Sequence, residues 1–215
     1  MDTKEKILIE ALKLFAAKGY KATSISDIAE TLKFTKGALY KHYKGKRDIL
    51  DCIIARMAEK DVQRAREYQV PEETYEKASD SYVEKDLENM LHFLEEQFVY
   101  WTEDEFASQF RRMITIEQYK DIQVSNLYQG YLSGGVVSYL TDFFREKIKT
   151  GELINRDAEK MAIEFYAPAY LMMNLYDVTD NKERMKELLK DQIQLFYKRY
   201  AIKYKEQGIT GEGIK

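Results

Sequence analysis

The sequence is poor in cysteine and lacks long apolar runs. Its 215 residues include one cysteine, Cys52, so no internal disulfide can form, which fits a reducing compartment. No apolar run approaches the roughly 18 residues that a membrane-spanning helix needs. The N-terminal stretch MDTKEKILIEALKLF mixes charged and apolar residues and lacks a signal-peptide core. We therefore expect a cytoplasmic protein without a membrane partner.

Groups that build catalytic and metal centres are also scarce. The chain has two histidines, His42 and His92, and the single cysteine. No HExxH, GxSxG, P-loop or CxxC pattern occurs. An active site or zinc site would need such groups to cluster, so we expect no enzyme, no metal and no other cofactor.

Two prolines and ten glycines leave room for long helices. Apolar residues recur at helical spacing along most of the chain, and no strand pattern is present. The sequence predicts an all-α fold of about nine helices, an N-terminal three-helix helix-turn-helix head followed by a C-terminal helical bundle. The expected helices cover about residues 3–18, 24–32, 35–43, 46–68, 82–101, 104–118, 122–149, 157–176 and 182–204. Glycines at 130, 134 and 135 should weaken or bend the seventh, and Pro168 should kink the eighth.

The formal net charge is −3, but the charged residues are distributed unevenly along the chain. Residues 1–50 carry eleven Lys or Arg and six Asp or Glu, whereas the remainder carries 23 and 31. A basic head on an acidic body is typical of a nucleic-acid binder with a separate regulatory region.

Residues 24–47 have the pattern of two short helices joined by a tight turn at 33–34. Ser24 and Asp27 have capping-box spacing at the start of the first helix, and Thr35 is a good N-cap for the second. From Lys33 to Arg47 there are six Lys or Arg and no acid. A short helix with cations and small residues on its outer face can enter the major groove of DNA.

Gly37 lies in this second helix, where glycine costs roughly 1 kcal/mol relative to alanine. Two explanations are open. Because glycine has no side chain, the helix backbone could approach base edges closely, or the glycine could merely ease the packing of a short helix. The basic surroundings favour the first explanation.

The segment from about Thr3 to Met57 resembles the DNA-binding domain of the tetracycline-repressor (TetR) family of bacterial transcriptional regulators. Tyr43 stands where the family usually has Phe, and beyond Met57 the resemblance thins to a helical pattern. The resemblance rests on Ile7, Ala11, Phe15, Gly19-Tyr20, Thr23-Ser24, Asp27-Ile28-Ala29, Thr35-Lys36-Gly37, Leu39-Tyr40, His42-Tyr43, Lys46 and Leu50.

Lys36 is the expected base contact, because lysine can donate to guanine O6 or N7. Tyr40, His42 and Lys46 resemble family positions that contact phosphates. The alternatives are a solvated surface charge for each lysine and a core position for His42. The expected DNA-binding residues are Thr23, Ser24, Thr35, Lys36, Gly37, Ala38, Tyr40, Lys41, His42 and Lys46.

The resemblance implies a DNA-binding domain at 1–61 and a ligand-sensing and dimerisation domain at 62–205, before a flexible tail at 206–215. The last two helices have apolar residues wider than one stripe, which favours dimerisation over a role in the monomer core alone. The expected dimer residues are Phe165, Met172, Leu188, Leu195 and Phe196. Aromatic and polarisable groups could line a cavity or simply pack the core. The expected ligand residues are His92, Trp101, Phe110, Met113, Tyr128, Tyr131, Tyr166 and Tyr170.

These expectations combine into one function. The chain would be a dimeric, ligand-responsive regulator, a repressor released from palindromic double-stranded DNA by an unidentified small-molecule effector. A helical interaction protein that has the same fold but does not bind an operator is the alternative.

Overall fold

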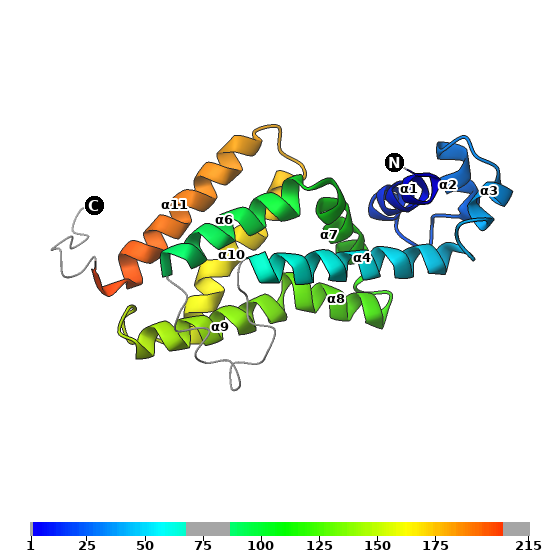
Figure 1. Cartoon of the computed structure of the whole chain (residues 1–215). Helices are drawn as coiled ribbons and strands as arrows, with labels where there is room; N and C mark the ends of the chain where they lie inside the picture. Colours follow the sequence, from blue (N-terminus) through cyan, green and yellow to red (C-terminus); the bar gives the residue numbers. More distant parts are fainter. Residues whose placement is uncertain (1, 68–86, 204–215) are drawn as a thin grey trace. The chain divides into compact units, whose positions relative to one another are not determined.

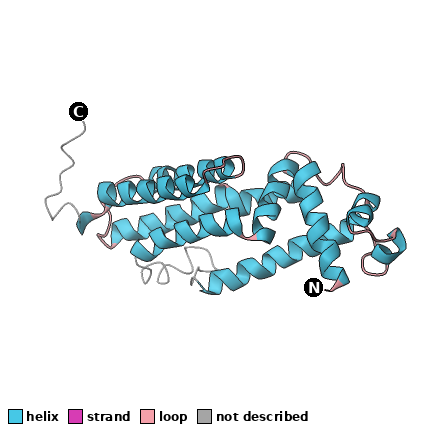
Figure 2. Ribbon diagram, turned by 90° about the horizontal axis from the view of Figure 1, so that it is seen from above, coloured by secondary structure: helices cyan, strands magenta, loops and turns pink. Residues whose placement is uncertain are grey.

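A computed structural model describes residues 2–67 and 87–203 of the chain (Figure 1). In these ranges every regular element is a helix, and the only extended pairing is an isolated bridge between Leu153 and Ala201 (Figure 2). The all-α prediction is confirmed. The helices are α1 (Thr3–Lys18), α2 (Ile25–Thr31), α3 (Lys36–Tyr40), α4 (Lys46–Glu67), α6 (Leu87–Glu103), α7 (Glu105–Glu117), α8 (Ile122–Leu132), α9 (Gly134–Lys149), α10 (Ala158–Tyr176) and α11 (Lys182–Tyr200).

The chain divides into two compact units. Unit 1 comprises Met1–Val70 and Glu103–Tyr131, and unit 2 comprises Pro71–Thr102 and Leu132–Lys215. Helices α7 and α8, which were expected in the ligand-sensing domain, therefore pack with the N-terminal helices. The functional boundaries at 61 and 205 stay predictions, and the predicted tail at 206–215 lies outside the described residues.

Unit 1 is built around α1, which packs against α2, α4 and α7. The apolar residues of α1 recur every three or four positions, so they form one buried side. Buried residues of α4 and α7 complete the same core. Residues of this core that are at most 1% exposed include Ile7, Leu12, Phe15, Ile49, Ile53, Met57, Phe110 and Ile114.

The helix predicted at 122–149 is two helices in the structure, and this prediction was wrong in its continuity. Ser133 separates α8 from α9 with φ −139° and ψ −115°, far from helical values. Two glycines follow it and lower the helix propensity there. The Tyr166 hydroxyl donates a 3.0 Å hydrogen bond to the carbonyl of Leu132 at the end of α8. A side chain remote in the sequence thus satisfies a carbonyl at the helix break.

In unit 2, helix α10 packs against α9 and α11. Three phenylalanines, one from each helix, form the centre: the Phe144 ring lies 5.4 Å from that of Phe165 and 5.2 Å from that of Phe196. Asp157 caps α10, as predicted, and Pro168 lies inside this helix. Each ring is buried, so this cluster contributes much of the apolar core of the unit.

Candidate nucleic-acid interface

The helix-turn-helix motif is fixed locally by its caps. The Asp27 amide donates to Ser24 Oγ at 3.2 Å, and the Ser24 amide donates to Asp27 Oδ2 at 2.6 Å, which is the predicted capping box. These bonds from Ser24, its backbone N–H first, lower the pKa of Asp27. At α3 the Ala38 amide donates to Thr35 Oγ1 at 3.2 Å. Between the helices Lys33 adopts φ +57°, a conformation uncommon for a side chain other than glycine, which makes the tight turn.

Helix α3 turns its polar residues outward. Lys36, Gly37, Lys41 and His42 are exposed, and Tyr40 is 56% exposed. Leu39 and Tyr43 are buried and anchor this segment in the core of unit 1. Since His42 is exposed, it is not a core histidine.

The surroundings of Gly37 bear on why glycine is present. A Cβ added there would lie 3.8 Å from Thr35 Oγ1 and would meet no other atom within 4 Å. Packing inside this chain therefore does not require a glycine at this position. The space outside the helix stays open to an approaching partner, which favours the explanation based on close approach.

Two expected DNA contacts have other roles in the structure. Thr23 is 1% exposed, and its hydroxyl donates to the Gly19 carbonyl at 2.9 Å. The Lys46 ammonium donates to the carbonyls of Tyr20 and Thr23, each at 2.7 Å. Both side chains are thus used inside the protein, because the loop before α2 offers carbonyls that the sequence pattern could not place. Their role as DNA contacts stays a prediction.

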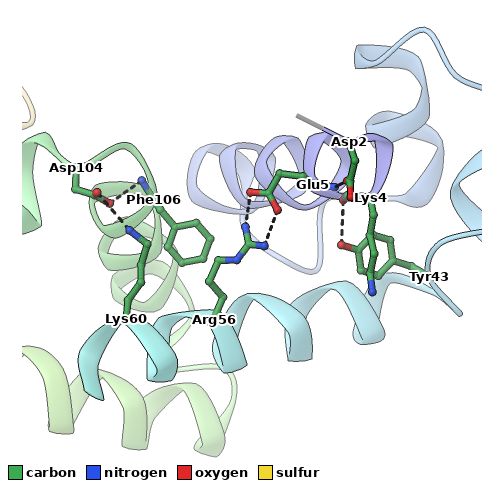
Figure 3. Close-up of polar contacts among 8 residues, drawn as sticks. All are labelled: Asp2, Lys4, Glu5, Tyr43, Arg56, Lys60, Asp104 and Phe106. Atoms are coloured by element: carbon green, nitrogen blue, oxygen red, sulfur yellow. Dashed lines mark hydrogen bonds and ion pairs between the residues drawn. The ribbon is translucent and has the colours of Figure 1, made fainter. Parts of the chain in front are cut away.

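Helix α4 is fastened to its neighbours in unit 1 (Figure 3). The two terminal guanidinium nitrogens of Arg56 donate to the two carboxylate oxygens of Glu5 in α1, and this bonding raises the pKa of Arg56. Farther along, the Lys60 ammonium lies 3.5 Å from Asp104, the N-cap residue of α7. The Tyr43 hydroxyl, just before α4, donates to the Lys4 carbonyl at 3.1 Å.

Comparison with known proteins identifies this part of the chain. Residues 7–53 match the family model described as bacterial regulatory proteins of the tetR family. Over these residues the chain is similar to the DNA-binding part of TetR-family regulators. The matched segment includes α2, α3 and the start of α4, where the caps and the exposed basic face lie.

Relatives of known sequence match the same segment. YuxN of Bacillus subtilis, an uncharacterised HTH-type transcriptional regulator, is 51% identical over 51 residues, which are 23% of this chain and 18% of YuxN. IcaR of Staphylococcus epidermidis, an HTH-type negative transcriptional regulator of the biofilm operon icaADBC, is 41% identical over 46 residues, which are 21% of this chain and 25% of IcaR. The match thus covers only about a fifth to a quarter of each relative.

Similarity in fold extends over most of the chain. The solved SmeT–triclosan complex has a TM-score of 0.62 with this structure and is 17% identical. The comparison covers 94% of this chain and 92% of SmeT. At that identity the likeness concerns the fold alone.

The expected ligand residues divide between the two units. In unit 1, Phe110, Met113 and Tyr128 are buried, and the Tyr131 ring lies 5.8 Å from that of Phe110. Burial, with a smaller contribution from Asp61, raises the pKa of Tyr131 to about 12.

In unit 2, Trp101 and Tyr166 are buried, and the rings of Tyr166 and Tyr170 lie 6.3 Å apart. The His92 side chain is 67% exposed and its Nε2 lies 3.1 Å from Glu96. His92 therefore lies on a solvent-accessible part of α6, and its role as a ligand residue stays a prediction.

The expected dimer residues differ in how exposed they are. Phe165, Met172 and Phe196 are buried within unit 2, where they contribute to its core, and their part in a dimer interface stays a prediction. Leu188 is half-buried and Leu195 is 53% exposed. The sequence pattern did not single out the exposed apolar residues of α10, although their intervals of eight and four residues indicate one stripe. They are Ile163, Leu171 and Leu175.

Proposed function

We propose that the chain is a DNA-binding transcriptional regulator that acts as a dimer and represses transcription until a small molecule releases it from a two-fold symmetric operator. The observation that carries this proposal is the outer face of α3, with Lys36 and Lys41 exposed on either side of the open space at Gly37. Cations around a closely approachable backbone suit the negatively charged major groove.

Repression is supported by the relationship to IcaR, a negative regulator, in the matched segment. One head would contact only a few base pairs, so a dimer on two half-sites is required for a long operator. The exposed apolar residues of α10, together with Leu195 on the neighbouring helix α11, supply a surface for a four-helix interface between copies.

Release by a small molecule is supported by the fold shared with SmeT, whose solved structure contains triclosan. Within unit 1, α7 packs directly against α1, and Lys60 of α4 pairs with the N-cap residue of α7. An effector that moves α7 would therefore move the head. A coupling free energy of about 1–3 kcal/mol would change operator affinity roughly 5- to 150-fold.

Selection from a random pool of duplex DNA tests the proposal. The purified chain should enrich palindromic sequences with half-sites about one helical turn, or a multiple of it, apart. A helical interaction protein with no operator would enrich no duplex above the level obtained with a variant that carries Lys36→Glu and Lys41→Glu. That result would remove the DNA-binding proposal and leave the alternative function.

The effector can be sought separately by thermal shift with a panel of apolar and amphipathic small molecules. A compound that raises the unfolding temperature should also release the enriched duplex. A compound that stabilises the protein but leaves DNA affinity unchanged would show that binding is not coupled to release.

A further inference from the structure

We propose that Glu117 of α7 and Lys46 of α4 are positioning residues that hold the Tyr20 backbone from two sides and thereby set the start of the DNA-reading motif. The role in DNA reading rests on the proposed function. The contacts of Glu117 and Lys46 with Tyr20 lie within unit 1 and can be tested without DNA.

The two side chains bind opposite polar groups of one residue. Glu117 Oε1 accepts from the Tyr20 amide at 3.1 Å, and Lys46 Nζ donates to the Tyr20 carbonyl at 2.7 Å. A carboxylate on the N–H and an ammonium on the C=O make both bonds charge-assisted, which is roughly twice as strong as a neutral pair. The Lys46 ammonium also lies 4.4 Å from the centroid of the Tyr20 ring, a cation–π distance.

The Glu117 carboxylate is buried and hydrogen-bonded in unit 1. Its residue is only 2% exposed, and a buried carboxylate is costly unless its oxygens are bonded. Lys120, one turn along the chain, supplies a second partner, with its Nζ 3.0 Å from the same Oε1. One buried oxygen thus receives the Tyr20 amide and an ammonium.

Gly19 is required by this arrangement in two ways. It has φ +87°, a conformation that L side chains rarely adopt. A Cβ built on it would also lie 2.7 Å from Glu117 Oε1, closer than real Cβ contacts. The absence of a side chain at Gly19 is therefore what lets the Glu117 carboxylate reach the loop.

The loop that is held this way leads directly to the motif. Lys46 Nζ also donates to the Thr23 carbonyl at 2.7 Å, and the Thr23 hydroxyl donates to the Gly19 carbonyl at 2.9 Å. Ser24, the N-cap of α2, is the next residue. The position of α7 is consequently transmitted to the start of the reading motif through one carboxylate, and Lys46 acts on the loop, not on a phosphate.

Salt dependence of DNA binding separates this role of Lys46 from a phosphate contact. The probe is a duplex enriched from the random pool by the unsubstituted chain, and the matched control is Lys44→Met at an exposed lysine two residues away. Lys46→Met should weaken binding at every salt concentration and leave the slope of log K against log salt unchanged. A slope shallower by about one unit would mean that Lys46 neutralises a phosphate and would overturn the proposal for this residue.

Amide exchange tests Glu117 in the protein without DNA. In the Glu117→Ala variant the hydrogen-exchange rate of the Tyr20 amide should rise at least about tenfold, because the amide loses its bond to a charged acceptor. Glu117→Gln, which keeps the shape and a neutral acceptor, should give an intermediate rate. Glu59→Gln, an exposed carboxylate on α4, controls for the change in net charge.

The outcomes distinguish the two proposals. If no duplex is enriched but the Tyr20 amide behaves as expected, the proposed function fails and the hold on the loop stands. If the amide rate is unchanged in both Glu117 variants while DNA binding is normal, the positioning role of Glu117 is overturned and the function stands.

Discussion

Arg56 and Glu5 form a bidentate ion pair that joins α4 to α1 (Figure 3). Both side chains are about two-thirds buried, with 32% and 30% exposed. Parallel hydrogen bonds fix orientation as well as distance, so the pair constrains the rotation of α4 about its axis. Since Lys60 of the same helix reaches Asp104, α4 is held to two neighbours in unit 1 along its length.

A double-mutant cycle measures what this pair contributes. Arg56→Met and Glu5→Gln should show a coupling energy of about 1 kcal/mol in urea unfolding, at the upper end for pairs that water reaches. The control is the exposed pair of Arg184 and Glu187 on α11, whose Nη1 and Oε2 are 3.2 Å apart and whose coupling should be close to zero. Equal couplings for both pairs would show that the bidentate geometry adds nothing measurable.

Tyr43 should make the stability of unit 1 sensitive to alkaline pH. Burial raises the pKa of Tyr43 to about 12, whereas an unfolded tyrosine titrates near about 10. Between these values the unfolded chain has lost a proton that the folded protein keeps, so the free energy of unfolding falls as pH rises. This contribution is complete below about pH 10 and is lost as pH passes about 12.

Urea unfolding of Tyr43→Phe from pH 7 to pH 11 tests this. At pH 7 the variant should be less stable by about 1 kcal/mol, because it loses the hydroxyl bond to the Lys4 carbonyl. Above about pH 10 its stability should fall less steeply than that of the parent. Tyr119→Phe, at a residue 90% exposed, should follow the parent curve. Parallel curves for Tyr43→Phe and the parent would contradict the assignment.

Lys36 should read bases. Lys36→Ala is expected to relax the preference at one or two base pairs per half-site, with a loss of discrimination of about 1–3 kcal/mol at each. Lys44→Ala, also at an exposed lysine, should weaken binding to all duplexes alike. A binding-site scan compares the two. Selectivity that survives Lys36→Ala unchanged would remove this lysine as a reader.

The head could be predicted from the sequence because its determinants are local. Ser24 and Asp27 are three residues apart, and the capping box depends on that spacing alone. The same holds for Thr35 at the start of α3 and for the buried stripe of α1. Lys36 is exposed at the first position of α3, directly after its N-cap Thr35, and the sequence pattern locates that helix start.

Contacts between distant residues could not be predicted in this way. The break at Ser133 is accompanied by the hydroxyl of Tyr166, 34 residues from the Leu132 carbonyl that it binds. The carbonyls that bind Lys46 belong to a loop more than twenty residues earlier. A lysine after a basic run has the same local pattern whether its ammonium binds a phosphate or a carbonyl, so the pattern could not indicate the carbonyl contacts of Lys46.

The outer face of α10 should join two copies of the chain. Ile163, Leu171 and Leu175 are exposed at intervals of eight and four residues, so they lie along one side of the helix, and Leu171 is 57% exposed. Leu171→Glu should convert a dimer into a monomer in light scattering, because a carboxylate would be buried in an apolar contact, and the helical circular dichroism should stay unchanged. Tyr119→Glu places the same charge on an exposed residue of unit 1 and should stay dimeric. A Leu171→Glu variant that remains dimeric at micromolar concentration would exclude this face as the interface, and loss of operator binding together with dimerisation would link the two properties.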